Sequence, residues 1–274
     1  MAQALKVGIV GCGAMGSSLA KIITRDFTKE VTLVALYDIA TEKSYVLSQK
    51  ISNNRSLGVN NLKKLIDRSQ LVIEAASMHS SLAIAAQVLT RGRNIIIMSA
   101  GGILGHLQEL QRLAGKHNAR VYIPSGAISG VDALKSAASG KINQVTLTTR
   151  KHPVSLKGAA LVRKKGIDLG KIKKDTVLFC GSAAQAVKYF PQNINVAAVL
   201  SLAGIGPHRT KIKIVASPSA KRNIHEIRIS SSAGEVFTRT ENVLHPDNPK
   251  TSYLAVLSAV ATLKQIFEPV RIGT

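Results

Sequence analysis

The stretch that decides the fold runs from Leu5 to Gly16 and reads Leu-Lys-Val-Gly-Ile-Val-Gly-Cys-Gly-Ala-Met-Gly. Its first half is apolar and predicts a short buried strand, and apolar residues recur at helical spacing over residues 19–23. The glycines between them form the pattern G-x-G-x-x-G. Because a strand precedes this pattern and a helix follows it, the sequence predicts a dinucleotide-binding turn.

Each glycine of this turn has its own physical reason. Gly11 permits the sharp turn, Gly13 lets the backbone approach a pyrophosphate, and Gly16 lets the helix pack closely on the strand. The free N–H groups of the first helical turn attract the phosphates. We therefore expect cofactor contacts from Gly11, Gly13, Ala14, Met15 and Gly16.

A carboxylate at the end of the second strand refines the cofactor prediction. The apolar run Val31–Tyr37 ends at Asp38, which comes 22 residues after Gly16 and is placed to accept a hydrogen bond from a ribose 2′-hydroxyl. A carboxylate here repels the 2′-phosphate of NADP, which favours NAD. Basic residues elsewhere in the chain offer a 2′-phosphate an alternative partner, so the predicted cofactor is NAD or NADP.

Length and composition narrow the class of protein. The chain has 274 residues, of which 45% are hydrophobic, enough for one large or two modest cores. It contains no run of about 18 apolar residues and starts a strand almost at once, without a signal peptide. We expect a cytoplasmic protein with no membrane partner. Cys12 and Cys180 are expected to be reduced, because a disulfide in the glycine turn would obstruct the ligand.

The net charge of +22 is the most unusual number in the composition. Such a field steers small anions, or it attracts nucleic acid. The chain has no Trp, 4% aromatic residues and no nucleic-acid-binding motif. Solvated lysines are therefore the favoured interpretation, and we expect no specific nucleic-acid partner.

Strands and helices alternate over the first 120 residues, which predicts a doubly wound parallel sheet of the Rossmann type. Ligands of such sheets bind at the carboxyl ends of the strands. The small residues Ala76 and Ser77 end one predicted strand and leave room for a cofactor. The predicted strands of this region are 5–10, 31–37, 71–77, 94–98 and 119–123.

The pattern changes at the turn Pro124–Gly130, which we take as the domain boundary. We expect this turn to form a wall of the nicotinamide pocket, with Ala127 approaching the cofactor; an ordinary connecting turn is the alternative. Beyond it, residues alternate with a period of two over 145–149, 211–215, 223–229 and 234–240, around helical patterns at 182–189 and 195–203. The second domain is therefore predicted to be α+β with a mixed sheet.

The last predicted helix opens at Asn248-Pro-Lys-Thr-Ser252 and runs to about Phe267. It is apolar on most sides, so it is expected to be buried against the first domain. The predicted domains are accordingly residues 1–125 plus about 250–274 for the dinucleotide, and 126–249 for the substrate and the catalysis.

A dehydrogenase needs a proton acceptor, and histidine suits that role near neutral pH. Among the seven histidines, His225 shares a strand face with Ile227 and Ile229, which turns its imidazole inward. A catalytic base and a satisfied core histidine explain this pattern equally well. His79, just after the strand end at Ser77, is the second candidate.

Two further segments suit an anionic substrate or an amide. The predicted helix start at 248–252 offers backbone N–H groups, hydroxyls and an ammonium that could bind a substrate carboxylate. The alternative is a capped helix start that binds no ligand. The amide side chains just before the predicted helix at 195–203 could hydrogen-bond the carboxamide of nicotinamide or the substrate. The alternative is that Asn195 simply caps that helix. No metal-ligand spacing is visible. The candidate residues of these two segments are Asn248, Lys250, Thr251 and Ser252, and Asn193 and Asn195.

The whole chain resembles an L-aspartate dehydrogenase of the NAD-biosynthesis type. The glycine turn is common to many dehydrogenases, whereas four later blocks are more specific in this order. Those blocks are Gly181-Ser-Ala-Ala-Gln-Ala-Val187, Phe190-Pro-Gln-Asn-Ile-Asn-Val-Ala-Ala198, Asn223-Ile-His-Glu-Ile227 and Asn248-Pro-Lys-Thr-Ser252. Glu74-Ala-Ala-Ser77 and Ile123-Pro-Ser-Gly-Ala-Ile-Ser-Gly130 also fit.

The resemblance implies oxidative deamination of L-aspartate with NAD or NADP. The product iminoaspartate is hydrolysed to oxaloacetate and ammonia or feeds quinolinate synthesis. The resemblance also implies that His225 is the catalytic residue, that Ala127 and either Asn193 or Asn195, with Asn195 preferred, contact the cofactor, and that the protein is a homodimer. The alternatives are another two-domain reductase, similar to dihydrodipicolinate reductase or homoserine dehydrogenase, and a nucleotide-binding or nucleic-acid-binding protein without turnover.

Overall fold

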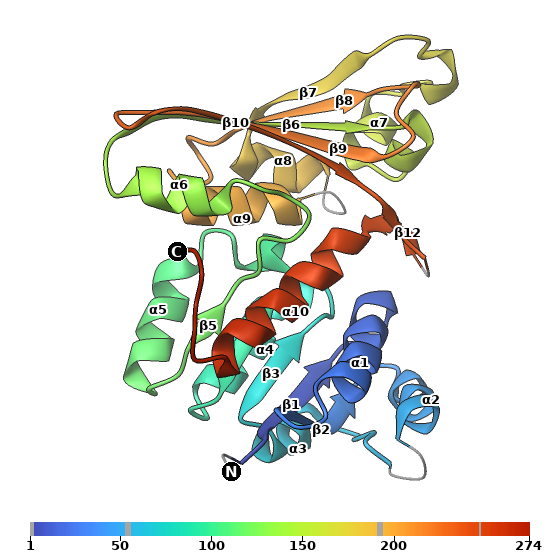
Figure 1. Ribbon diagram of the computed structural model, residues 1–274. Coiled ribbons are helices and arrows are strands. Elements are labelled where there is room, and N and C mark those ends of the chain that lie inside the picture. The colour runs from blue at the N-terminus through green and yellow to red at the C-terminus, as the bar shows by residue number, and fades with distance from the viewer. Residues whose placement is uncertain (1–2, 53–55, 191–193, 247) are drawn as a thin grey trace. The chain divides into compact units, whose positions relative to one another are not determined.

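The computed structural model describes residues 3–52, 56–190, 194–246 and 248–274. The chain divides into two compact units. The first unit comprises residues 1–124 and 258–271, and the second comprises residues 125–257 and 272–274. Figure 1 labels most of their helices and strands.

The first unit is built on five parallel strands in the order β2-β1-β3-β4-β5, joined by helices, which confirms the predicted doubly wound sheet. Its strands are β1 (Leu5–Val10), β2 (Val31–Tyr37), β3 (Leu71–Glu74), β4 (Asn94–Ile97) and β5 (Val121–Tyr122). Its helices are α1 (Ala14–Asp26), α2 (Thr41–Ile51), α3 (Leu62–Arg68), α4 (Met78–Leu89) and α5 (Leu107–Lys116), with a 3-10 turn η1 (Ala100–Ile103).

The central strands of this sheet are buried on both faces. Ile9, Ile73 and Ile96 on one face, and Val72 and Ile95 on the other, expose at most 1% of their surface. Parallel strands covered by helices on both faces need such continuous apolar runs. Each fully buried aliphatic side chain of this kind contributes about 1.5–3 kcal/mol to stability.

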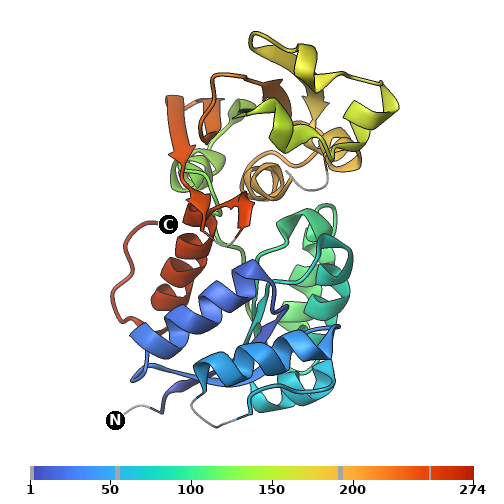
Figure 2. The same cartoon turned by 90° about the vertical axis from the view of Figure 1, so that its right-hand side faces the viewer.

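The helix α10 (Tyr253–Phe267) places its last ten residues in the first unit. The ring of Phe267 meets the ring of Phe27, just after α1, edge to face at a centroid distance of 5.8 Å. Figure 2 shows α10 beside α1. The last part of α10 thus packs into the core of the first unit.

The strand order fixes where a ligand would bind the first unit. From β1 the chain moves to β2 on one side and then to β3 on the other, so the order reverses at β1. The crevice at such a reversal lies between the carboxyl ends of the two strands that flank it. Here these ends carry the glycine turn after Val10 and the segment after Glu74, and the Ala75 N–H donates to the Val10 carbonyl at 2.8 Å.

The second unit contains a mixed sheet in the order β10-β9-β6-β8-β7, in which only β6 and β8 are parallel. Helices α6, α8 and α9 lie along one face of it, which we call the inner face (Figure 1). The predicted α+β class is confirmed. The strands are β6 (Ile142–Lys151), β7 (Thr176–Ser182), β8 (Lys211–Ala216), β9 (Asn223–Ser231) and β10 (Gly234–Asn242). The helices are α6 (Val131–Ala138), α7 (Ala160–Lys164), α8 (Ala183–Tyr189) and α9 (Asn195–Ala203), with 3-10 turns η2 (Pro153–Leu156) and η3 (Leu169–Lys171).

One prediction about local structure is wrong. Residues Asn248–Ser252 form a strand, β12, which pairs antiparallel with β11 (Leu244–His245), and the helix begins only at Tyr253. The Asn-Pro start signal is local, whereas the hairpin is a pairing with a preceding segment that this signal does not report. Residues 248–252 are therefore not a helix start, and their backbone does not provide the free helical N–H groups that we expected to bind a carboxylate.

No helix in the part of the chain that the structure describes is long and apolar enough to span a membrane.

Candidate functional site

The glycine turn has the geometry that a pyrophosphate needs. Gly11 has a φ of +92°, and a Cβ there would lie 2.5 Å from the Ala75 carbonyl oxygen. A Cβ on Gly16 would overlap the Gly11 carbonyl oxygen, whereas a Cβ on Gly13 would meet nothing within 4 Å. Gly11 and Gly16 are thus required by the fold itself. The open space at Gly13 is where an incoming phosphate can approach the backbone and the start of α1, which holds Ala14 and Met15.

Asp38 lies directly after β2 and joins the glycine turn. One carboxylate oxygen accepts from the Cys12 N–H at 2.7 Å, and the other accepts from the Ala40 N–H at 2.9 Å. Each oxygen keeps a lone pair for a further donor such as a ribose hydroxyl. Burial, and next the Asp38 charge, raise the pKa of the Cys12 thiol to about 12, so this cysteine stays protonated.

A buried carboxylate holds the neighbouring strand ends. Glu74 is 0% exposed, and its two oxygens accept from the Ala76 N–H at 2.9 Å and the Ser99 N–H at 3.1 Å. Burial raises the pKa of Glu74, and these hydrogen bonds oppose that shift. Ala76 and Ser77 are exposed beyond this support, as residues that face a ligand must be.

In the second unit, Ala127 is 6% exposed, and its carbonyl accepts from Asn242 Nδ2 at 2.9 Å. The turn before α6 is therefore tied to the end of β10. This contact also fixes the Asn242 amide, because the reverse orientation would set two oxygens against each other.

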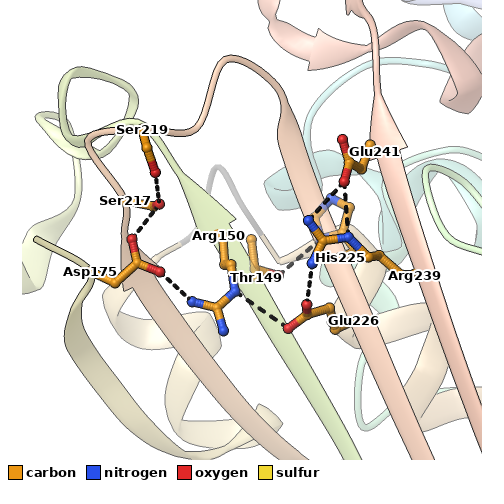
Figure 3. Close-up of polar contacts among 9 residues, drawn as sticks. All are labelled: Thr149, Arg150, Asp175, Ser217, Ser219, His225, Glu226, Arg239 and Glu241. Carbon is orange, nitrogen blue, oxygen red and sulfur yellow. Dashed lines mark hydrogen bonds and ion pairs between the residues drawn. The ribbon is translucent and has the colours of Figure 1, made fainter.

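The imidazole of His225 is 4% exposed and lies on the inner face of the sheet, with Ile227 and Ile229. Its Nδ1 shares a hydrogen bond with Thr149 Oγ1 at 3.0 Å, and the register places Thr149 directly opposite on β6 (Figure 3). When Nδ1–H donates to this hydroxyl, Nε2 keeps the lone pair that accepts a proton. The pair therefore presents a neutral base with a fixed ring.

The inner face changes from apolar to polar around this histidine. Toward one end of the strands it carries buried aliphatic residues, such as Val145 and Leu147. Toward the other end it carries a buried group that we call the polar end. Its members, between 1% and 6% exposed, are Thr149, Lys151, Asn223, His225 and Asn242.

Electrostatics keep His225 neutral. Burial, and next the charge of Lys151, lower the pKa of His225 to about 3. Burial lowers the pKa of Lys151 to about 8. At neutral pH the polar end therefore holds a neutral imidazole beside an ammonium. The positive charge of Lys151 opposes protonation of His225, and an anionic group paired with Lys151 would offset that effect.

The pKa of His225 should make stability depend on pH. Its folded pKa lies below the ordinary value of 6.5, so between pH 3 and 6.5 the unfolded chain binds more protons. Stability that is fully present above pH 6.5 should be lost as the pH falls, by up to about 1.4 kcal/mol per unit. Urea unfolding followed by circular dichroism from pH 4.5 to 7 should show that the free energy of unfolding depends less on pH in His225→Asn than in the wild type. Equal slopes in the two proteins would contradict a lowered pKa of His225.

The opposite face of the same sheet carries a chain of ion pairs, drawn in Figure 3. Glu226 pairs with Arg239 at 2.6 Å and with Arg150 at 3.4 Å, and Arg150 pairs with Asp175 at 2.6 Å. These residues line an open cavity of about 560 Å³. His225 does not line it, so this cavity is separate from the polar end.

The remaining predicted residues are placed as follows. Asn195 is exposed and is the first residue of α9, whose N-cap is Ile194 rather than Asn195. Asn193 lies outside the described residues, as do the side chains of Asn248 and Lys250. Thr251 is half-buried, and Ser252 is buried at the end of β12. His79 is exposed at the start of α4.

Sequence reasoning missed Lys151, Asn223 and Asn242 of the polar end. The predicted alternation covered residues 145–149, whereas β6 continues to Lys151, which has the same parity as Val145 and Leu147. Asn242 gives no such signal, because it ends an edge strand whose inner residues are mostly half-buried.

Two family models match most of the chain. The model "Aspartate dehydrogenase, C-terminal" matches residues 132–266, and the model "Homoserine dehydrogenase, NAD binding domain" matches residues 11–124. The first match includes His225 and the whole polar end. The second includes the glycine turn and Asp38.

Known proteins match over the full length. An L-aspartate dehydrogenase of Methanosarcina mazei is 44% identical, over 98% of this chain and 100% of the relative. One of Nitrosopumilus maritimus is 38% identical, over 98% and 99%. The crystal structure of aspartate dehydrogenase from Thermotoga maritima covers 99% of this chain and 100% of its own, with 28% identity and a TM-score of 0.73. A homoserine dehydrogenase in complex with NADPH, at 15% identity and a TM-score of 0.60, shares the fold.

Proposed function

The chain belongs to the L-aspartate dehydrogenase family, and we propose that it oxidises L-aspartate to iminoaspartate with a nicotinamide dinucleotide. The observation that carries this proposal is the neutral imidazole of His225, fixed by Thr149 beside the ammonium of Lys151, in a chain that matches this family over nearly its full length. Hydrolysis of the imine then gives oxaloacetate and ammonia.

The first unit fits the cofactor. The open approach at Gly13, the close packing at Gly16 and the carboxylate of Asp38 match the pyrophosphate and ribose of a dinucleotide. When bound, the nicotinamide accepts the hydride that leaves the α-carbon. Ala76, Ser77, Ala127 and Asn195 are proposed to contact the cofactor.

In the chemistry assigned to the second unit, Nε2 of His225 takes a proton from the substrate ammonium or from the water that attacks the imine. Thr149 keeps the ring in place through Nδ1. Burial keeps the imidazole neutral, so the base needs no prior deprotonation at neutral pH.

A spectrophotometric assay at 340 nm tests this function. L-aspartate with NAD or NADP should give turnover, and D-aspartate and L-glutamate should give much less. Turnover of homoserine, or reduction of dihydrodipicolinate in place of aspartate oxidation, would assign the chain to another activity. Salt-dependent binding to random DNA without turnover of any amino acid would indicate a binding protein.

We propose NAD as the preferred cofactor, because the Asp38 carboxylate lies against the glycine turn. In Asp38→Asn, the ratio of kcat/KM for NADP to that for NAD should rise roughly 10- to 100-fold, since repulsion of the 2′-phosphate is removed. Asp67→Asn, an exposed carboxylate on α3, is the matched control. An unchanged ratio in Asp38→Asn would show that other residues select the cofactor.

The resemblance further supports a homodimer and a role in NAD biosynthesis. Both remain predictions, as does a cytoplasmic location.

A further inference from the structure

One buried acceptor at the polar end is unsatisfied. Asn242 is 2% exposed, and its Nδ2 is committed to the Ala127 carbonyl. Its Oδ1 has no hydrogen-bond partner among the described residues. An amide oxygen buried without a donor costs free energy, so such an atom is expected to receive an N–H from a bound molecule.

The sheet register places this acceptor near the base. Asn242 on β10 lies opposite Asn223 on β9, and Thr240 lies opposite His225. Asn242 is thus one strand and two residues away from His225, on the same inner face. An amino group that His225 deprotonates would lie within the area that both side chains border.

Lys151 borders this area from the other side. It lies two residues beyond Thr149 on β6, and Thr149 is opposite His225. It is 6% exposed and shares the inner face, whereas Lys213 on β8, which lies opposite Thr148, is on the other face. A lysine on this face offers a compact positive charge to a carboxylate.

We propose that Lys151 and Asn242 hold the amino diacid beside His225, with the Lys151 ammonium pairing with a substrate carboxylate and Asn242 Oδ1 accepting an N–H of the substrate amine. This inference rests on the proposed function and names two further substrate-binding residues for it. Lys151 then recognises a carboxylate, which other diacids share, whereas Asn242 and His225 both act on the amine, which a simple diacid lacks.

Binding without turnover tests the proposal separately from the activity. In the presence of NADH, hydride transfer from the substrate is blocked, so the affinity for L-aspartate and for succinate, a four-carbon diacid without an amine, is measured by calorimetry. Lys151→Met should weaken both ligands about 10- to 100-fold, since both carry the carboxylates. Lys151→Arg should retain more affinity than Lys151→Met. Lys213→Met is the matched control and should bind both ligands normally.

Asn242→Leu should discriminate between the two ligands. It should weaken L-aspartate about 10-fold and leave succinate nearly unchanged, because only aspartate has the N–H groups that Oδ1 accepts. Equal weakening of both ligands would indicate a merely structural role through Ala127, and a fall in NADH affinity would assign Oδ1 to the cofactor; either result overturns this part of the proposal.

Unchanged affinities in Lys151→Met would overturn the carboxylate assignment. These outcomes are distinguishable from failure of the proposed function. If the wild-type enzyme binds succinate through Lys151 but does not oxidise aspartate, the diacid site stands and the activity assignment falls. If aspartate is oxidised and neither variant changes its binding, the activity stands and the inference falls.

Discussion

Replacement of His225 by alanine should lower kcat for L-aspartate by roughly 10²- to 10⁴-fold, the usual contribution of a positioned acid–base group. The imidazole is the group that the sheet register, the Thr149 hydrogen bond and the burial combine to orient. Cofactor affinity should change little, because the glycine turn and Asp38 belong to the other unit. The measurement is kcat with saturating cofactor, together with a fluorescence titration of NADH.

The same experiment separates the two explanations of an inward histidine. A satisfied core histidine would lower stability when removed but leave kcat per folded molecule unchanged. A catalytic histidine would lower kcat in a protein that still binds NADH. His106→Ala, an exposed histidine paired with Glu109 at 3.1 Å, controls for the loss of an imidazole in general. An unchanged kcat in His225→Ala would remove the assignment of the base.

The effect should also depend on the side chain that replaces histidine. Asparagine can keep the hydrogen bond to Thr149 but has no basic nitrogen. If His225→Asn is as slow as His225→Ala, the missing function is proton transfer. If it recovers most of the rate, the imidazole acts mainly by filling and ordering the polar end.

The parallel sheet was predictable because its signals are local and repeated. Each strand of the first unit is an apolar run that ends in small or polar residues. The helices between the strands show apolar residues at helical spacing. The glycine turn adds a constraint that does not depend on packing, since Gly11 adopts a positive φ and Gly16 lies against a carbonyl oxygen. Sequence alone therefore predicts the glycine turn and the parallel sheet that carries it.

The second unit was harder to predict where structure depends on pairing. Asn248–Ser252 carries a strong helix-start signal, yet its backbone pairs with Leu244–His245. Thr176–Ser182 contains a continuous apolar run rather than an alternation, so period-two patterning does not predict it as a strand, and its pairing with β8 shifts register between Val177 and Phe179. In both segments the partner strand, rather than the local sequence, decides the conformation.

The candidate site shows the same limit. Alternation on β9 turns His225 inward, whereas Lys151 faces inward only because β6 continues two residues past the alternating run 145–149. What alternation cannot supply is the alignment between strands. The placement of Asn242 near His225 follows only from the register of β9 and β10. Faces of strands are predictable from sequence, whereas neighbours across the sheet are not.

Alanine at Gly13 and at Gly16 should weaken dinucleotide binding in both cases but lower stability only at Gly16, and this is the second large effect that we expect. In Gly16→Ala the new Cβ would overlap the Gly11 carbonyl oxygen, which is backbone and cannot rotate away. Helix α1 must then move from β1, at a cost of about 1–3 kcal/mol or more. The displaced helix start should also weaken dinucleotide binding by at least roughly tenfold.

Gly13→Ala separates folding from ligand binding. Gly13 has φ −74° and ψ −167°, which alanine adopts without strain, and its Cβ would meet no protein atom within 4 Å. The free energy of unfolding should therefore stay within about 0.5 kcal/mol of the wild type. NADH affinity should nevertheless fall by roughly tenfold or more, because the methyl group occupies the space through which a pyrophosphate approaches the backbone. Urea unfolding and a fluorescence titration measure both quantities on the same samples. Full NADH affinity in a stable Gly13→Ala variant would show that the phosphates do not bind at this turn, since no other reason for a glycine at this position appears in its backbone or its surroundings.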